Sequence, residues 1–300
     1  MNGIIVGCLG GLYFVMSDGK KYDCRARGSF RHDKNPPLVG DRCSFSADPK
    51  QGFVIEKLAE RKNALIRPSV ANIDCLVIAF AVRSPAPDTL YIDKLSSVAV
   101  YNKIAPVVAI TKADLDMGAA ENFKKIYETA GIPVFITSSE KGEGISELHD
   151  YISSRKDETF AFAGASGVGK SSLINALFPG LVLKTGAVSE KIERGRHTTR
   201  AVSLYELGGF IDGATGFIAD TPGFSMLDFI EFNFFPREEL PHTFPEFEKY
   251  LGKCRWRDCT HTKEDGCAIT EAVARGEIAK SRRESFIKMD EELSKKNVWE

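Results

Sequence analysis

The chain has 300 residues, of which 43% are hydrophobic and 27% are charged. This composition excludes a disordered or fibrous chain, and the length suggests two or three domains of roughly 100–200 residues each. The net charge of −1 excludes general attraction to polyanions but leaves room for local basic clusters. No apolar run reaches the roughly 20 residues that cross a bilayer, and the first residues do not resemble a secretory leader, so we expect no membrane partner and a cytoplasmic location.

Residues 1–62 are predicted to form a small β-barrel. Five short strands are expected at Gly3–Val6, Leu12–Met16, Lys21–Arg25, Val39–Phe45 and Phe53–Leu58. The turn Ser17-Asp18-Gly19 suits a tight hairpin, because Asp and Gly accept the positive φ angles that such turns need. This number of strands in so short a segment favours an OB-type barrel, with an SH3-like barrel as the alternative.

Residues 63–230 are predicted to form a parallel sheet covered by helices. Runs that are apolar throughout, as in strands buried on both faces, occur at Cys75–Ala81, Pro106–Ile110, Pro133–Ile136, Phe160–Ala163 and Phe217–Ala219. Helix-like stretches at Asp88–Val100, Ala119–Ala130 and Ile145–Ser154 alternate with them. This alternation is typical of an α/β domain.

A phosphate-binding loop follows the strand Phe160–Ala163. The segment Gly164-Ala-Ser-Gly-Val-Gly-Lys-Ser171 matches the pattern G-x-x-x-x-G-K-[ST] and leads into an apolar helical stretch. Glycines let backbone N–H groups surround phosphates, Lys170 neutralises the outer phosphates, and Ser171 offers a hydroxyl to Mg²⁺. The predicted phosphate-binding residues are Gly164, Ala165, Ser166, Gly167, Val168, Gly169, Lys170, Ser171, Ser172 and Gly223.

Asp220 stands at the end of an apolar strand, in the sequence Asp-Thr-Pro-Gly223. A carboxylate placed there can hold Mg²⁺, and the Gly223 N–H can reach a terminal phosphate. The polar segment 194–200 lies between this motif and the phosphate-binding loop, and Thr198 or Thr199 can complete the magnesium shell; the alternative is a solvated basic loop. The predicted magnesium set is Ser171, Thr198, Thr199 and Asp220.

Two short segments are predicted to read guanine. Thr111-Lys-Ala-Asp114 follows one apolar strand, and Ser138 and Ser139 follow the next. The Asp114 carboxylate can accept hydrogen bonds from guanine N1–H and the exocyclic amine, a donor pair that adenine lacks. Lys112 can lie along the base, and the serines can approach its edge. Both segments fall at carboxyl ends of predicted parallel strands, where open α/β sheets bind ligands.

The order of these motifs is reversed relative to Ras-like GTPases, where the phosphate loop comes first. Here the base-reading segments precede the phosphate motifs at 164, 198 and 220. A circular permutation keeps one site intact, because neighbouring termini allow the chain to be cut elsewhere without moving the sheet. We therefore expect a circularly permuted P-loop GTPase domain.

Residues 231–300 are predicted to form a zinc-binding helical domain. Cys254, Cys259, His261 and Cys267 lie within fourteen residues. Three thiolates and one imidazole suit tetrahedral Zn²⁺, and four protein ligands leave no open position for water, so the site is expected to be structural. A polar helix is expected from Ile269 to the end of the chain, with its alternating charges exposed.

The permuted order, GASGVGKSS, GRHTT, DTPGF, the segment RPSVANID and the Cys/His set together resemble the bacterial ribosome small-subunit-dependent GTPase A family (RsgA/YjeQ) over nearly the whole chain. The resemblance implies an OB-fold, a permuted GTPase domain and a zinc domain. It also implies GTP and GDP as ligands and a late role in maturation of the small ribosomal subunit. Thr111 departs from the family pattern, which has Asn at this position.

Catalysis requires a group that orients the attacking water. Ras-like enzymes use a Gln just after the D-x-x-G motif, but Phe224 occupies that position here. The resemblance implies that His197 of GRHTT positions the water once a partner orders the loop. A surface or RNA-contacting role for His197 is the alternative.

Basic residues cluster at Lys20–His32, at 194–200 and at Arg255–Arg257 around Trp256. These clusters are candidate contacts to RNA or ordinary solvated charge, and the family resemblance favours ribosomal RNA. A monomer is the default expectation. Two other functions compete: an RNA-binding assembly factor in which nucleotide is only an occupancy signal, and a P-loop kinase.

Overall fold

The computed structural model describes residues 1–31, 36–181, 202–220 and 234–295. They form two compact units. The first contains Met1–Cys75, Ile152–Phe162 and the described part of residues 190–224; the second contains Leu76–Tyr151 and the described parts of residues 163–189 and 225–300. None of the helices in these described ranges is long and apolar enough to span a bilayer.

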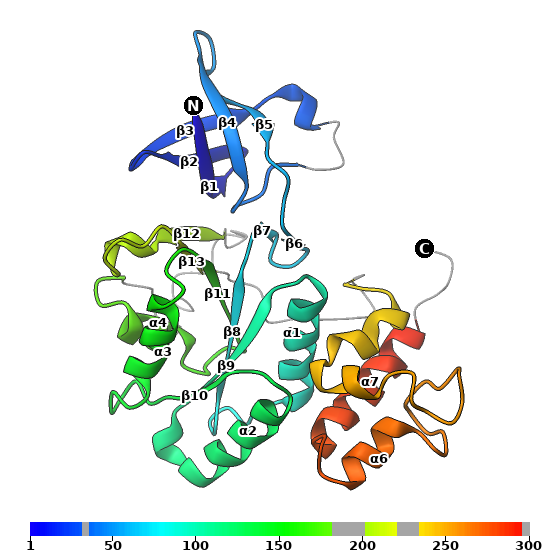
Figure 1. Cartoon of the computed structure of the whole chain (residues 1–300). Coiled ribbons are helices and arrows are strands. Elements are labelled where there is room, and N and C mark those ends of the chain that lie inside the picture. The colour runs from blue at the N-terminus through cyan, green and yellow to red at the C-terminus, as the bar shows by residue number, and fades with distance from the viewer. Residues whose placement is uncertain (32–35, 182–201, 221–233, 296–300) are drawn as a thin grey trace, which may run out of the picture. The chain divides into compact units, whose positions relative to one another are not determined.

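The N-terminal segment of the first unit is a five-stranded barrel (Figure 1). Its strands are β1 (Asn2–Leu9), β2 (Leu12–Ser17), β3 (Lys20–Ala26), β4 (Arg42–Asp48) and β5 (Gly52–Leu58). They pair in the order β1-β2-β3-β5-β4, and an additional β1–β4 pairing closes the barrel. Because β3 runs parallel to β5 instead of pairing with β4, the barrel is not a simple meander. The predicted OB-type barrel is confirmed.

Local sequence explains this barrel well. Asp18 and Gly19 both have positive φ, at 49° and 68°, as a two-residue hairpin turn between β2 and β3 requires. Alternate residues of the strands point inward, and Ile5, Val15 and Ile55 are fully buried. The short 3-10 helix η1 (Gly28–Arg31) follows β3.

The rest of the first unit extends the sheet from the barrel. Strand β11 (Thr159–Ala163) pairs parallel with β13 (Phe217–Asp220), as predicted. Between β13 and β1 lies an unpredicted strand, β12 (Ser203–Glu206), which is antiparallel to both. Smaller elements are β6 (Ala64–Leu65), β7 (Val70–Ala71) and η3 (Leu207–Gly209).

The second unit contains most of the base-reading half and the helix that follows the phosphate-binding loop. Its strands are β8 (Cys75–Ala81), β9 (Ala105–Thr111) and β10 (Val134–Ile136), in the order β10-β9-β8. Its helices before residue 181 are α1 (Thr89–Tyr101), α2 (Met117–Thr129), α3 (Ile145–Ser153) and α4 (Lys170–Leu177), with η2 (Ala113–Leu115) after β9. All seven residues of β8 are buried, which explains its uninterrupted apolar sequence.

The C-terminal part of the second unit differs from the prediction. It contains η4 (Arg237–Thr243), η5 (Pro245–Tyr250), α6 (Ala268–Ala274) and α7 (Lys280–Ser294). The single polar helix expected from Ile269 is therefore wrong, since two helices with a break replace it. The expected exposure is also wrong, because α7 packs against α1 and buries Phe286 and Met289 together with Arg282 (Figure 1).

A buried ion network joins α7 to α1. Arg282 is 1% exposed; its Nη1 donates to Asp93 of α1 at 2.6 Å and its Nε donates to Glu246 of η5 at 2.7 Å. The guanidinium also lies 4.5 Å from the centre of the Phe244 ring. Such a network stabilises the fold only while every partner is present, because an unpaired buried charge is costly.

We predict that Arg282→Ala lowers the free energy of unfolding by about 3–5 kcal/mol, because it leaves the Asp93 and Glu246 carboxylates buried without their cation. Urea unfolding followed by circular dichroism measures this. Lys280→Ala on the same helix is the matched control: its exposed pair with Glu284 should contribute no more than about 0.5 kcal/mol. Equal stability of the two variants would contradict the account.

Candidate nucleotide and metal sites

The phosphate-binding loop connects β11 to α4. Three of its glycines, Gly164, Gly167 and Gly169, have positive φ angles of 153°, 78° and 92°. A Cβ on Gly164 would lie 2.3 Å from the Ala79 carbonyl oxygen, so the close approach to β8 also requires glycine. Helix α4 begins at Lys170, directly after the loop, and Leu173 and Ile174 anchor it in the core. The predicted strand–loop–helix arrangement is present.

The segment Thr111–Asp114 follows β9 and turns sharply at Lys112, whose φ is 54°. Strand β10 runs parallel to β9 with Ile136 opposite Ile110, so the segments after both strands emerge at one edge of the sheet. There the Ser138 hydroxyl donates to the half-buried Asp114 carboxylate at 2.6 Å. Ser138 itself is fully buried, so it orients Asp114. Ser139 beside it is half-buried.

The base-reading segment and the phosphate loop touch each other. Lys112 Nζ donates to the Gly167 carbonyl at 2.8 Å, and also to the Ser84 carbonyl. The Thr111 hydroxyl lies within hydrogen-bonding distance of the Val168 and Phe80 carbonyls. Segments more than fifty residues apart in the chain are thus held together by side-chain hydrogen bonds to the backbone of the loop.

Only some of the residues predicted to bind magnesium and the terminal phosphate or to position water fall within the described ranges. Asp220 is half-buried at the end of β13, which runs parallel to β11 with Ala219 opposite Ala161. The carboxylate therefore lies at the sheet edge where β11 also ends. Ser171 belongs to the first turn of α4. His197, Thr198, Thr199 and Gly223 lie outside the described residues.

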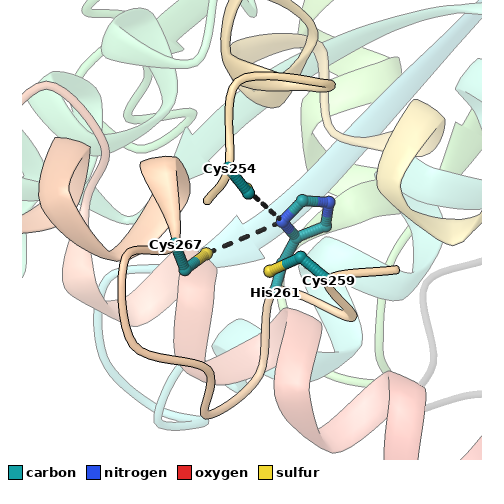
Figure 2. Close-up of side chains that lie close together, drawn as sticks. All are labelled: Cys254, Cys259, His261 and Cys267. Carbon is teal, nitrogen blue, oxygen red and sulfur yellow. Dashed lines mark hydrogen bonds between the residues drawn. The ribbon is translucent and has the colours of Figure 1, made fainter. Parts of the chain in front are cut away.

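The four predicted zinc ligands come together between η5 and α6 (Figure 2). Their ligand atoms all lie within 4.8 Å of one another, and His261 Nδ1 is 3.5 Å from Cys254 Sγ and 3.6 Å from Cys267 Sγ. A tetrahedral zinc site with ordinary bond lengths has an S···N edge of about 3.6 Å. Burial lowers the pKa of His261, which favours the neutral imidazole that binds metal. The cluster therefore fits a structural zinc ion.

Glu264 is a supporting residue that the sequence reasoning missed. Its carboxylate accepts hydrogen bonds from Thr260 N at 2.8 Å, Thr260 Oγ1 at 2.6 Å and Thr262 N at 3.1 Å. Burial opposes ionisation, but these hydrogen bonds prevail and lower the pKa of Glu264 to about 2. The ionised carboxylate closes the turn that carries His261. An acidic residue after a Thr-x-Thr pattern was the available signal.

The fold and these sites define a P-loop nucleotide-binding protein with its base-reading and phosphate segments in permuted order and a Cys₃His metal site near its C-terminus. Family models give the assignment: the RsgA GTPase model matches residues 58–230 and the RsgA N-terminal domain model matches residues 2–55. The chain belongs to the RsgA GTPase family, as the resemblance implied.

Relatives align over nearly the full length. The small ribosomal subunit biogenesis GTPase RsgA of Caldanaerobacter subterraneus subsp. tengcongensis is 42% identical, covering 99% of this chain and 97% of the relative. That of Moorella thermoacetica is 43% identical over 96% and 95%. Among solved structures, YjeQ from Thermotoga maritima has a TM-score of 0.80 at 36% identity over 99% of both chains. YloQ, described as a circularly permuted GTPase, has a TM-score of 0.74 at 32% identity over 98% and 94%.

We predict that the purified chain holds one zinc ion and that Cys259→Ser loses it, because one of four ligands is removed. Elemental analysis of the protein measures zinc directly. Cys8→Ser is the matched control, since Cys8 is another half-buried cysteine but lies in the barrel. Full zinc occupancy in Cys259→Ser would rule out the proposed ligand set.

Proposed function

We propose that this chain hydrolyses GTP to GDP and phosphate, that the small ribosomal subunit stimulates the reaction, and that the protein acts late in assembly of that subunit while bound to its rRNA. The observation that carries the proposal is the contact of Thr111 and Lys112 with the phosphate-loop carbonyls of Val168 and Gly167. This contact supports a single pocket for the proposed base-reading carboxylate of Asp114 and the proposed phosphate-binding Lys170. The curated relatives, named as small-subunit biogenesis GTPases, supply the partner.

In this proposal Asp114 recognises guanine. Its carboxylate accepts hydrogen bonds from N1–H and the exocyclic amine, and the bond from Ser138 fixes its orientation. Thr111 and Lys112 act mainly through the loop, because their polar atoms already bond to its carbonyls. Ser139 directly follows Ser138 and is half-buried, and we propose it for the base edge.

The triphosphate occupies the loop Gly164–Ser172, with Lys170 neutralising the outer phosphates and Gly223 donating to the terminal one. Ser171, Asp220, Thr198 and Thr199 would hold Mg²⁺, which supplies charge neutralisation between the outer phosphates when bound. The oxygen-donor character of the set fits magnesium, since Mg²⁺ prefers carboxylate, hydroxyl and water ligands.

We propose that His197 positions the attacking water. Phe224, which takes the place of the usual Gln, has no polar group for this task. Basal hydrolysis is then slow, and docking on the subunit accelerates it by bringing His197 to the terminal phosphate. A protein that uses GTP only as an occupancy signal would show no such acceleration.

The domain arrangement that we propose is a barrel at 1–62, a GTPase domain at 63–230 and a C-terminal zinc domain at 231–300. The zinc is structural, because Cys254, Cys259, His261 and Cys267 fill its tetrahedron. We propose a monomer, since one chain carries both the base-reading and the phosphate segments. We also propose a cytoplasmic location, which suits a role in ribosome assembly.

We predict that added small ribosomal subunits strongly stimulate GTP hydrolysis, and that His197→Ala loses about 100-fold or more of the stimulated rate while keeping its GTP affinity. Phosphate release measured with and without subunits tests both. The control is His242→Ala, a change at an exposed histidine outside the nucleotide site. Wild-type hydrolysis that ignores subunits would refute the function; undiminished stimulation in His197→Ala would remove only that residue from the mechanism.

A further inference from the structure

An exposed tryptophan lies on the metal-binding loop. Trp256 is 53% exposed, although tryptophan is highly buried on average in folded proteins. It lies between the ligands Cys254 and Cys259, so a bound metal ion would fix the backbone on both sides of it. An aromatic ring on a rigid loop offers stacking area with little loss of conformational freedom on binding.

One cation lies against this ring, and two more are close to it in the sequence. The Arg255 guanidinium lies 5.0 Å from the centre of the indole ring. Arg255 is itself fixed: its N–H donates to the Gly266 carbonyl at 2.9 Å, and its stem passes so close to Gly266 that a Cβ there would be 2.8 Å away. Lys253 and Arg257 are exposed as well. Among the described residues, no carboxylate forms an ion pair with any of these three cations.

An exposed indole with Arg255 against it and two more exposed cations nearby in the sequence matches a partner that has both flat rings and negative charge. Unpaired RNA bases have accessible faces for stacking, and the adjacent phosphates attract Lys and Arg. A base-paired helix hides its base faces. An apolar protein partner would account for the indole but leave the three cations without a role.

We propose that Trp256 is a stacking platform for an unpaired RNA base, with Lys253, Arg255 and Arg257 contacting the flanking phosphates. This inference deepens the proposed function, because it gives the C-terminal domain a defined mode of contact with RNA. Cys254 and Cys259, as ligands of a bound ion, would then also hold the loop that carries the ring in place for the base.

Fluorescence tests the stacking directly, because the chain contains only two tryptophans. In a Trp299→Phe background, Trp256 is the sole indole reporter. We expect unstructured single-stranded RNA to quench its emission, and expect an RNA duplex of equal length and inorganic polyphosphate to leave it nearly unchanged. Equal quenching by the duplex or by polyphosphate would overturn base stacking.

Variants at the ring separate stacking from apolar contact. We expect Trp256→Ala and Trp256→Leu each to weaken single-stranded RNA binding about tenfold, and Trp256→Phe to keep most of it, because a phenyl ring still stacks. Zinc content and basal GTP hydrolysis, which should match the parent protein, check folding. RNA affinity in Trp256→Leu equal to the parent would overturn the proposal.

Failure here and failure of the proposed function are distinguishable. If Trp256→Leu binds RNA normally while subunits still stimulate GTP hydrolysis, the stacking platform is wrong and the function stands. If the parent protein stacks single-stranded RNA but ignores subunits, the platform stands and the proposed function is wrong.

Discussion

Thr111 and Lys112 follow β9, yet their side chains bond to the backbone of a loop more than fifty residues further along the chain. Each bond satisfies a carbonyl of the loop, and together they hold the segment that carries Asp114 against the loop that precedes Lys170. Thr111 makes this contact where the family pattern has Asn. A threonine hydroxyl carries one proton for the two nearby carbonyls of Phe80 and Val168, so it bonds to one of them at a time.

The segment that contacts the phosphate loop is also connected to the C-terminal part of the second unit. Lys112 also bonds to the Ser84 carbonyl, and α1 begins five residues after Ser84. Asp93 of α1 then pairs with the buried Arg282 of α7. Within the second unit, hydrogen bonds and the intervening chain 84–93 thus connect the phosphate loop through α1 to α7.

The sequence predicted the features that depend on local chemistry. Turn residues such as Asp18-Gly19, the fully apolar β8, the glycine loop and the four metal ligands each carry their own signal, and all are present. The buried side of α7 was missed because Arg282 and Asp290 resemble surface charges until their partners on α1, η4 and η5 are known. Strand β12 was missed because four mixed residues form a strand only when β13 and β1 pair with them. Likewise, the task of Ser138 depends on the parallel pairing of β9 with β10.

The central claim is that the base-reading and phosphate-binding segments form a single nucleotide pocket. The most direct test changes the hydrogen-bonding groups of both the protein and the nucleotide base. In Asp114→Asn, the amide keeps an acceptor for Ser138 but presents a donor to the position of the guanine amine, where xanthine has a carbonyl oxygen. Affinities for GDP and for xanthosine diphosphate are then compared in both proteins. The account predicts that the variant loses about tenfold or more in GDP affinity and comes to prefer xanthosine diphosphate. Unchanged preference for GDP would show that Asp114 does not face the base of a nucleotide held by the loop at Lys170.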